Sequence, residues 1–249
     1  MYRTSFFSSL PPVVKNLLIL NVLIWLFMAI VPAADHTLTK YLALYYFTSP
    51  AFEPYQLFTY MFLHGNFMHL FFNMFALLMF GRTIEMTMGS SRFLFYYLTC
   101  GICAALVQMG IFAIYIDRLT DILPPDVTNH VMDNGLALLR QHMNYADPDC
   151  AALNAFVNTP MVGASGAIYG VLLAFGFLFP NLPVYIFFVP VPIKAKWLII
   201  GYFVLELIYG ISGSADGVAH FAHLGGMIFG FLLLLYWKKK GVFTNHWFF

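Results

Sequence analysis

The chain has 249 residues, of which 61% are hydrophobic, 19% aromatic and only 9% charged. Soluble domains carry about 25% charged residues, so this composition indicates a protein that lies in a lipid bilayer. The formal net charge of +1 argues against a nucleic-acid partner, which needs a basic face. The cysteines lack the spacing of disulfides or zinc sites and are interpreted as unpaired thiols: Cys100, Cys103 and Cys150.

Six segments are apolar enough, or nearly so, to cross about 30 Å of hydrocarbon as helices. The sequence therefore predicts an all-α polytopic membrane protein with six transmembrane helices. The first segment is interpreted as an anchor, not a cleavable signal, because five further spans follow it. Prolines break the apolar connection between the fourth and fifth spans, which we expect at the membrane interface. The predicted spans are residues 16–34, 56–80, 93–116, 163–180, 197–213 and 218–237.

Lysine and arginine are distributed unevenly between the connections. With the N-terminus inside, the inner segments hold nine of these residues and the outer segments three, so both termini are predicted to be cytoplasmic. Residues 1–15 and 238–249 would then flank a membrane domain over residues 16–237. The outer loop at 117–162 holds six of the eleven acidic residues. Its middle could form a short helix, and the loop is either a cap or a tolerated insertion.

Polar side chains inside predicted spans are costly, which makes them candidates for function. Counted at 1.5 Å per residue from the outer ends, Ser165, His223 and His69 all fall in the outer half of the bilayer. Glycines follow Ser165 and His223 at helical spacing. Such stripes let membrane helices approach closely, so we expect the fourth and sixth spans to bring Ser165 and His223 together.

These residues can support nucleophilic catalysis. A serine hydroxyl needs an adjacent base, which is most often histidine. A histidine, an asparagine amide and backbone N–H groups can stabilise an oxyanion. We therefore predict a dyad of Ser165 and His223 supported by His69 and Asn73, without a metal or any other cofactor. Glu206 is expected at central depth, bonded to a neighbouring helix, and is not assigned as a third member.

Other interpretations stay open for the same residues. Each polar side chain alone is more typical of hydrogen bonding between helices than of catalysis. A channel would place polar groups at all depths and often shows an internal repeat. A zinc protease is disfavoured because the chain lacks H-E-x-x-H.

The chain resembles the rhomboid family of intramembrane serine proteases, in its bacterial six-span form. The resemblance covers about residues 16–237, apart from the loop at 117–162. It rests on four motifs in chain order: His64-x4-His69-x3-Asn73; Gly81-x3-Glu85-x3-Gly89; Gly163-x-Ser165-Gly166 with Tyr169; and Ala222-His223-x2-Gly226-x3-Gly230.

The resemblance implies that Ser165 is the nucleophile and His223 its general base. His223 is preferred over His220 because it alone has glycines three and seven residues later. The family also implies that Gly163 lies beside the nucleophile and that Tyr169 packs near the base.

The resemblance further implies that His69 and Asn73 help to form the oxyanion hole, with His64 in the same water-accessible cavity. The fifth span would be a lateral gate, and residues 32–57 a loop embedded in the membrane. Substrates would be membrane proteins cut near the outer ends of their transmembrane segments, in a bacterial inner membrane. The alternative is an inactive rhomboid-like protein that binds membrane clients.

Overall fold

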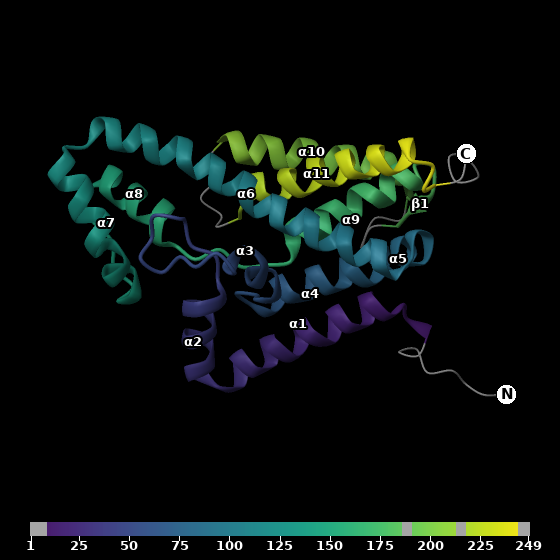
Figure 1. The fold of residues 1–249 in the computed structure, drawn as a ribbon, viewed down its shortest axis with the longest axis horizontal. Helices are drawn as coiled ribbons and strands as arrows, with labels where there is room; N and C mark the ends of the chain where they lie inside the picture. Colours follow the sequence, from purple (N-terminus) through teal and green to yellow (C-terminus); the bar gives the residue numbers. More distant parts are fainter. Residues whose placement is uncertain (1–8, 186–190, 213–217, 244–249) are drawn as a thin grey trace.

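The computed structural model describes residues 9–185, 191–212 and 218–243, and most of these are helical (Figure 1). Parts of the predicted terminal segments, residues 1–8 and 244–249, lie outside the described residues, as do 186–190 and 213–217. The helices are α1 (Pro12–Ile30), α2 (Pro32–Leu42), α3 (Gln56–Thr59), α4 (Phe67–Ala76), α5 (Arg82–Met88), α6 (Ser90–Ile122), α7 (Pro125–Arg140), α8 (Pro148–Asn158), α9 (Ser165–Leu178), α10 (Ala195–Ser212) and α11 (His220–Lys239). The proline-rich connection forms a hairpin of β1 (Pro183–Val184) and β2 (Ile193–Lys194).

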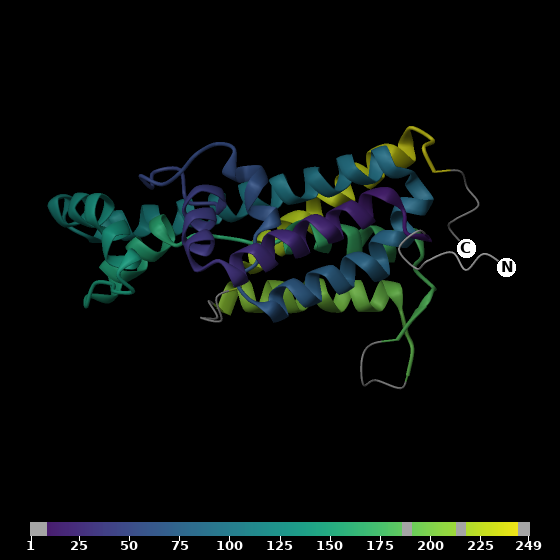
Figure 2. The same cartoon turned by 90° about the horizontal axis from the view of Figure 1, so that it is seen from below.

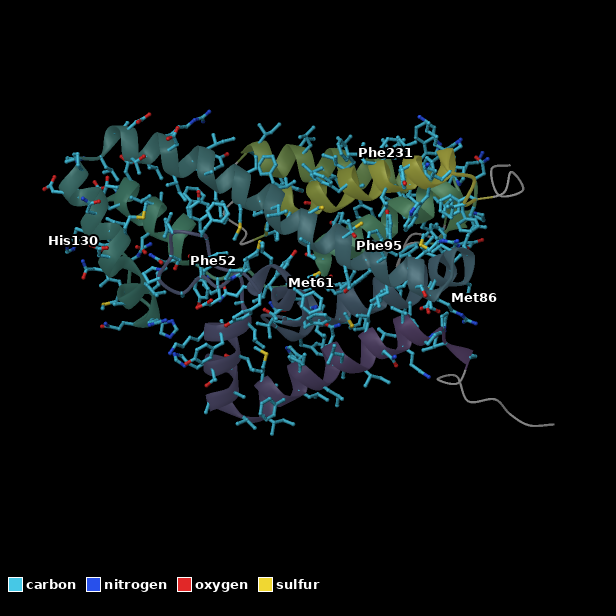
Figure 3. All side chains as sticks on the ribbon, in the orientation of Figure 1. Phe52, Met61, Met86, Phe95, His130 and Phe231 are labelled. Carbon is cyan, nitrogen blue, oxygen red and sulfur yellow. The ribbon has the colours of Figure 1, made fainter. Side chains whose placement is uncertain are left out.

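The all-α polytopic prediction is confirmed. Five helical segments of the described chain are long and apolar enough to span a membrane: Pro12–Ile30, Phe67–Met88, Ser90–Ile122, Ala195–Ser212 and His220–Lys239. Large apolar side chains remain exposed along them, including Phe95 (57%) and Phe231 (40%) (Figure 3). Exposed apolar surface on this scale needs a lipid environment.

The predicted start of the second span, at residue 56, is wrong. The chain passes through α3, a 3₁₀ turn at Tyr60–Phe62 and irregular residues before α4 begins at Phe67. Asn66 caps α4, because its Oδ1 accepts a hydrogen bond from the backbone N–H of His69 at 2.8 Å. His69 therefore lies in the first turn of α4 and not some 13 residues into a helix. From α4 the span continues through a π-helical segment at Leu77–Gly81 into α5.

The fourth span, α9, is shorter than expected. It has 14 residues, or about 21 Å at 1.5 Å per residue, and starts at Ser165. Ten of those residues are buried, since α9 packs against α11, α6, α10 and α4. A buried central helix can be short because its ends are covered by protein and not by lipid.

The outer loop is largely helical, as its predicted short helix suggested. It comprises the end of α6, then α7 and α8, with His130 of α7 far from the bundle (Figures 1 and 3). Ser49, between α2 and α3, donates a hydrogen bond to Asn158 of α8 at 2.7 Å. Asn158 in turn donates to Asn154 at 3.0 Å. These buried contacts tie α8 to the rest of the molecule.

The start of α1 and the end of α11 lie at one end of the bundle, and α7 and α8 lie at the other (Figures 1 and 2). This arrangement agrees with an even number of spans. The predicted membrane-embedded loop at 32–57 contains α2 and an irregular segment before α3.

Candidate active site

Ser165 is the first residue of α9 and is partly exposed. The strand-like segment that leads to it is held by backbone hydrogen bonds. Leu44 and Met161 exchange a pair of these at 2.9 and 2.8 Å, and the N–H of Gly163 donates to Tyr60 O at 3.0 Å. Irregular backbone at membrane depth requires such partners within the protein. Ser165 is thereby fixed at a helix N-terminus, where the first N–H groups have no intrahelical acceptor.

The structure brings Ser165 and His223 together, as the glycine stripes predicted. Ser165 Oγ and His223 Nε2 are 2.8 Å apart, across the contact of α9 with α11. A methyl group on Gly226 would overlap the carbonyl oxygen of Gly166, so the two helices touch backbone to backbone. The second glycine of the stripe, Gly230, instead faces Tyr96 of α6.

Tyr169 lies one turn below Ser165 and covers the face of His223. The two rings are stacked, with centroids 4.1 Å apart and an interplanar angle of 6°. Aromatic contacts of this kind restrict ring rotation, because leaving the stack removes dispersion and burial together. The expectation that Tyr169 packs near the base is met by this geometry.

Glu206 lies in the candidate site, to which the sequence did not assign it. It is expected to bond to a neighbouring helix, and it does, but its partners are the two histidines of α11 and Tyr169 of α9. Oε2 lies 2.6 Å from His220 Nδ1 and 3.0 Å from His223 Nδ1, although the second approach is not aligned as a hydrogen bond. The hydroxyl of Tyr169 donates to Oε1. Depth along α10 could not reveal this, because the rotation of α10 against α11 is set by packing.

Gly163 and His69 lie next to each other beside Ser165. Gly163 has a φ of +129°, a backbone conformation that residues with a side chain rarely adopt. A Cβ there would lie 2.7 Å from His69 Nε2 and 3.7 Å from Ser165 Oγ. The absence of a side chain therefore lets the His69 ring approach the serine.

His64 and Asn73 are both buried near His69 but differ in their contacts. The His64 ring meets the His69 ring edge to face, with centroids 5.1 Å apart. Neither ring nitrogen of His64 has a hydrogen-bond partner among the described residues, which fits a site reached by water. The Asn73 amide donates to His69 O, one turn earlier in α4, at 2.8 Å. Its expected direct part in an oxyanion hole stays a prediction.

Gln108 of α6 was missed by the sequence analysis. Its Oε1 accepts a hydrogen bond at 3.0 Å from the backbone N–H of Ala222 in the first turn of α11, which also donates to Ala219 O at 2.9 Å. An uncharged glutamine in an apolar helix carries little signal in one sequence. Its contact helps to fix the turn that carries His223.

One cluster has the residue types of a metal site. Glu206, His220 and His223 each offer a ligand atom, and these atoms lie within 4.8 Å of one another. Two histidines and a glutamate can bind zinc. In this structure the Nδ1 atoms of both histidines lie within 3.0 Å of Glu206 Oε2.

Comparison with known proteins gives two findings. The sequence profile of the Rhomboid domain matches residues 51–116 and 132–240. The chain is also similar to "Rhomboid protein 1, mitochondrial" of Saccharomyces cerevisiae, with 29% identity over 181 residues. That alignment covers 72% of this chain and 40% of the yeast protein, so the chain spans less than half of this relative. The profile match includes residues 132–162, whereas the resemblance was expected to leave out the whole loop at 117–162.

Proposed function

This chain belongs to the rhomboid family of integral membrane proteins, and from that premise we propose that it is an intramembrane serine endopeptidase. Members of the family are generally serine proteases that act on membrane proteins, and some are inactive. The observation that carries the proposal is the 2.8 Å contact between Ser165 Oγ and His223 Nε2. This distance suits proton transfer from nucleophile to base.

In the proposed reaction, Ser165 Oγ attacks the carbonyl carbon of a peptide bond while His223 Nε2 takes the hydroxyl proton. This requires the tautomer of His223 with its proton on Nδ1. The intermediate collapses as His223 returns the proton to the leaving amine. A water molecule, activated by the same base, then hydrolyses the acyl-enzyme and releases the second product.

The negative oxygen of the intermediate needs fixed donors close to Ser165. The unpaired N–H groups at the start of α9 and the ring of His69 are the proposed donors. The positive end of the α9 dipole adds to this stabilisation. His64 is proposed to hold water in the same cavity, while Gly163 leaves the space through which His69 acts.

The substrate is proposed to be a membrane protein cut near the outer end of a transmembrane segment. Ser165 is the first residue of α9, and α9 runs from the side of α7 and α8 toward the end that holds the termini (Figure 1). We place the side of α7 and α8 outside and both termini in the cytoplasm, following the lysine and arginine distribution. Entry past α10, at the edge of the bundle, and a bacterial inner membrane are parts of the same proposal.

Cleavage of a single-span test protein in liposomes tests the proposal. Ser165→Ala is expected to abolish cleavage, because it removes the proposed nucleophilic oxygen Oγ. Ser91→Ala is the matched control, since Ser91 is an exposed residue at the start of α6. Full activity of Ser165→Ala, or no cleavage by the wild type with any single-span substrate, would reject the protease. Client binding without cleavage would favour the inactive alternative, in spite of the intact Ser–His pair.

A further inference from the structure

Two buried carboxylates occur among the described residues, Glu85 and Glu206, and they have different surroundings. Glu85 accepts hydrogen bonds from the backbone N–H groups of Val13 and Val14 at 2.9 and 2.7 Å and from Ser90 Oγ at 2.7 Å. It therefore caps α1 and joins it to α5 and α6. None of its partners belongs to the candidate site.

Glu206, in contrast, has all its described side-chain partners around His223, the proposed general base. Its Oε2 lies between the Nδ1 atoms of His220 and His223, at 2.6 and 3.0 Å. Its Oε1 accepts the hydroxyl of Tyr169, whose ring is stacked on His223. The carboxylate is 7% exposed, and three side chains hold it in one place.

We propose that Glu206 is a positioning residue for His223, so that the site works with three members instead of two. The proposal rests on the proposed protease function. Because Nε2 of His223 faces Ser165, a base must carry its proton on Nδ1, and Glu206 Oε2 is the carboxylate oxygen 3.0 Å from that atom. The carboxylate favours this tautomer and this ring orientation. It also stabilises the imidazolium that forms when Nε2 takes the serine proton.

The other ionisable groups around His223 do not replace Glu206. His220 of α11 shares the same carboxylate oxygen. Tyr169 of α9 contributes its ring face and a donor hydroxyl, and His69 of α4 lies on the Ser165 side. None of these brings a negative charge to Nδ1. Since Glu206 belongs to α10, the orientation of the base also depends on where α10 lies.

The test compares variants by kcat, KM and pH profile on a single-span substrate in liposomes. Glu206→Gln keeps the size and an acceptor oxygen but removes the charge. We expect kcat to fall roughly 10²-fold with KM within about twofold, since carboxylates of serine triads contribute about 10⁴-fold. Without the charge the imidazolium is less stable, so the acid limb of the profile should move to lower pH. Glu206→Asp keeps the charge, so the acid limb of its pH profile should lie at the same pH as that of the wild type.

Two controls separate positioning from structure. Glu53→Gln makes the same chemical change at an exposed position and should leave kcat and the profile unchanged. Glu85→Gln should lower thermal stability without moving the acid limb.

Three outcomes decide the proposal. A folded Glu206→Gln with kcat within about threefold of the wild type and an unmoved acid limb would overturn it. If Glu206→Gln does not fold, Tyr169→Phe decides, because it keeps the stacked ring and removes only the hydroxyl on Oε1. We expect kcat of that variant to fall several-fold, and an unchanged kcat would overturn the proposal. Failure of the wild type to cleave would reject the protease function itself.

Discussion

Replacement of Gly163 by alanine tests the geometry beside the nucleophile. The new methyl group would lie 2.7 Å from His69 Nε2, whereas ordinary contacts of this kind begin near 3.4 Å. The His69 ring must therefore move by about 0.7 Å, or the α9 entry must shift. In addition, φ of +129° is strained for alanine, at about 1–3 kcal/mol.

The expected effect on activity follows from this displacement. A misplacement of about 1 Å at a reacting centre can cost about 10²-fold in rate, so we expect Gly163→Ala to lose roughly 10- to 10²-fold in kcat. The assay is initial-rate cleavage of a single-span substrate in liposomes, with thermal unfolding measured in parallel.

Gly65, in the segment before α4, offers a matched control. A methyl group on Gly65 would meet only a side-chain carbon of Val162 at 4.0 Å, so Gly65→Ala should keep its rate within about twofold. A Gly163→Ala protein that cleaves as fast as Gly65→Ala would refute the assignment of Gly163 and His69 to the site.

Three further predictions concern packing and stability. Gly226→Ala should abolish cleavage, because its methyl would overlap the carbonyl oxygen of Gly166 and part α9 from α11; a wild-type rate would contradict this packing. Glu85→Gln should lower the free energy of unfolding by about 1–3 kcal/mol in denaturation experiments, because it weakens the acceptor of the Val13 and Val14 amides at the start of α1; an unchanged value would contradict the cap. Asp147 caps α8, because its Oδ1 accepts a hydrogen bond from the Cys150 N–H. This bond lowers the pKa of Asp147 below its ordinary 3.8. The cap therefore stabilises α8 above pH 3.8, and this stabilisation is lost as the pH falls through the lower pKa of the folded state. As the pH falls through that pKa, protection of the Cys150 amide from hydrogen exchange should drop in the wild type but not in Asp147→Asn.

The pairing of Ser165 with His223 could be predicted because its signals are local. Each residue precedes small residues at helical spacing, and such stripes mark close helix contacts whatever the rest of the fold does. Gly163 was likewise expected beside the nucleophile through the family resemblance. Its positive φ, which has no signature in composition, required the structure.

The start of α4 could not be read from hydropathy. The segment before it is rich in apolar residues, such as Phe58, Phe62 and Leu63, and Asn66 marks the start of the helix only through its role as the cap. Hydropathy measures which residues avoid water, and irregular backbone buried in protein avoids water equally well. The estimate of the depth of His69 failed for this reason.

Glu206 could be recognised as costly in a membrane, but its partners could not be identified. Its contacts depend on the rotation of α10 against α9 and α11. That rotation is set by side chains spread over three helices, such as Gly210 of α10 against Phe221 of α11. A single sequence gives the spacing along one helix and not the phase between helices.

Labelling of the purified protein with a serine-reactive phosphonate tests the central claim most directly. The probe forms a bond to a serine only when an adjacent base activates it. Mass spectrometry should find one modified residue, Ser165, in the wild type and in Ser91→Ala. The label should be absent from Ser165→Ala and His223→Ala. Labelling of another serine, or undiminished labelling of His223→Ala, would contradict the account.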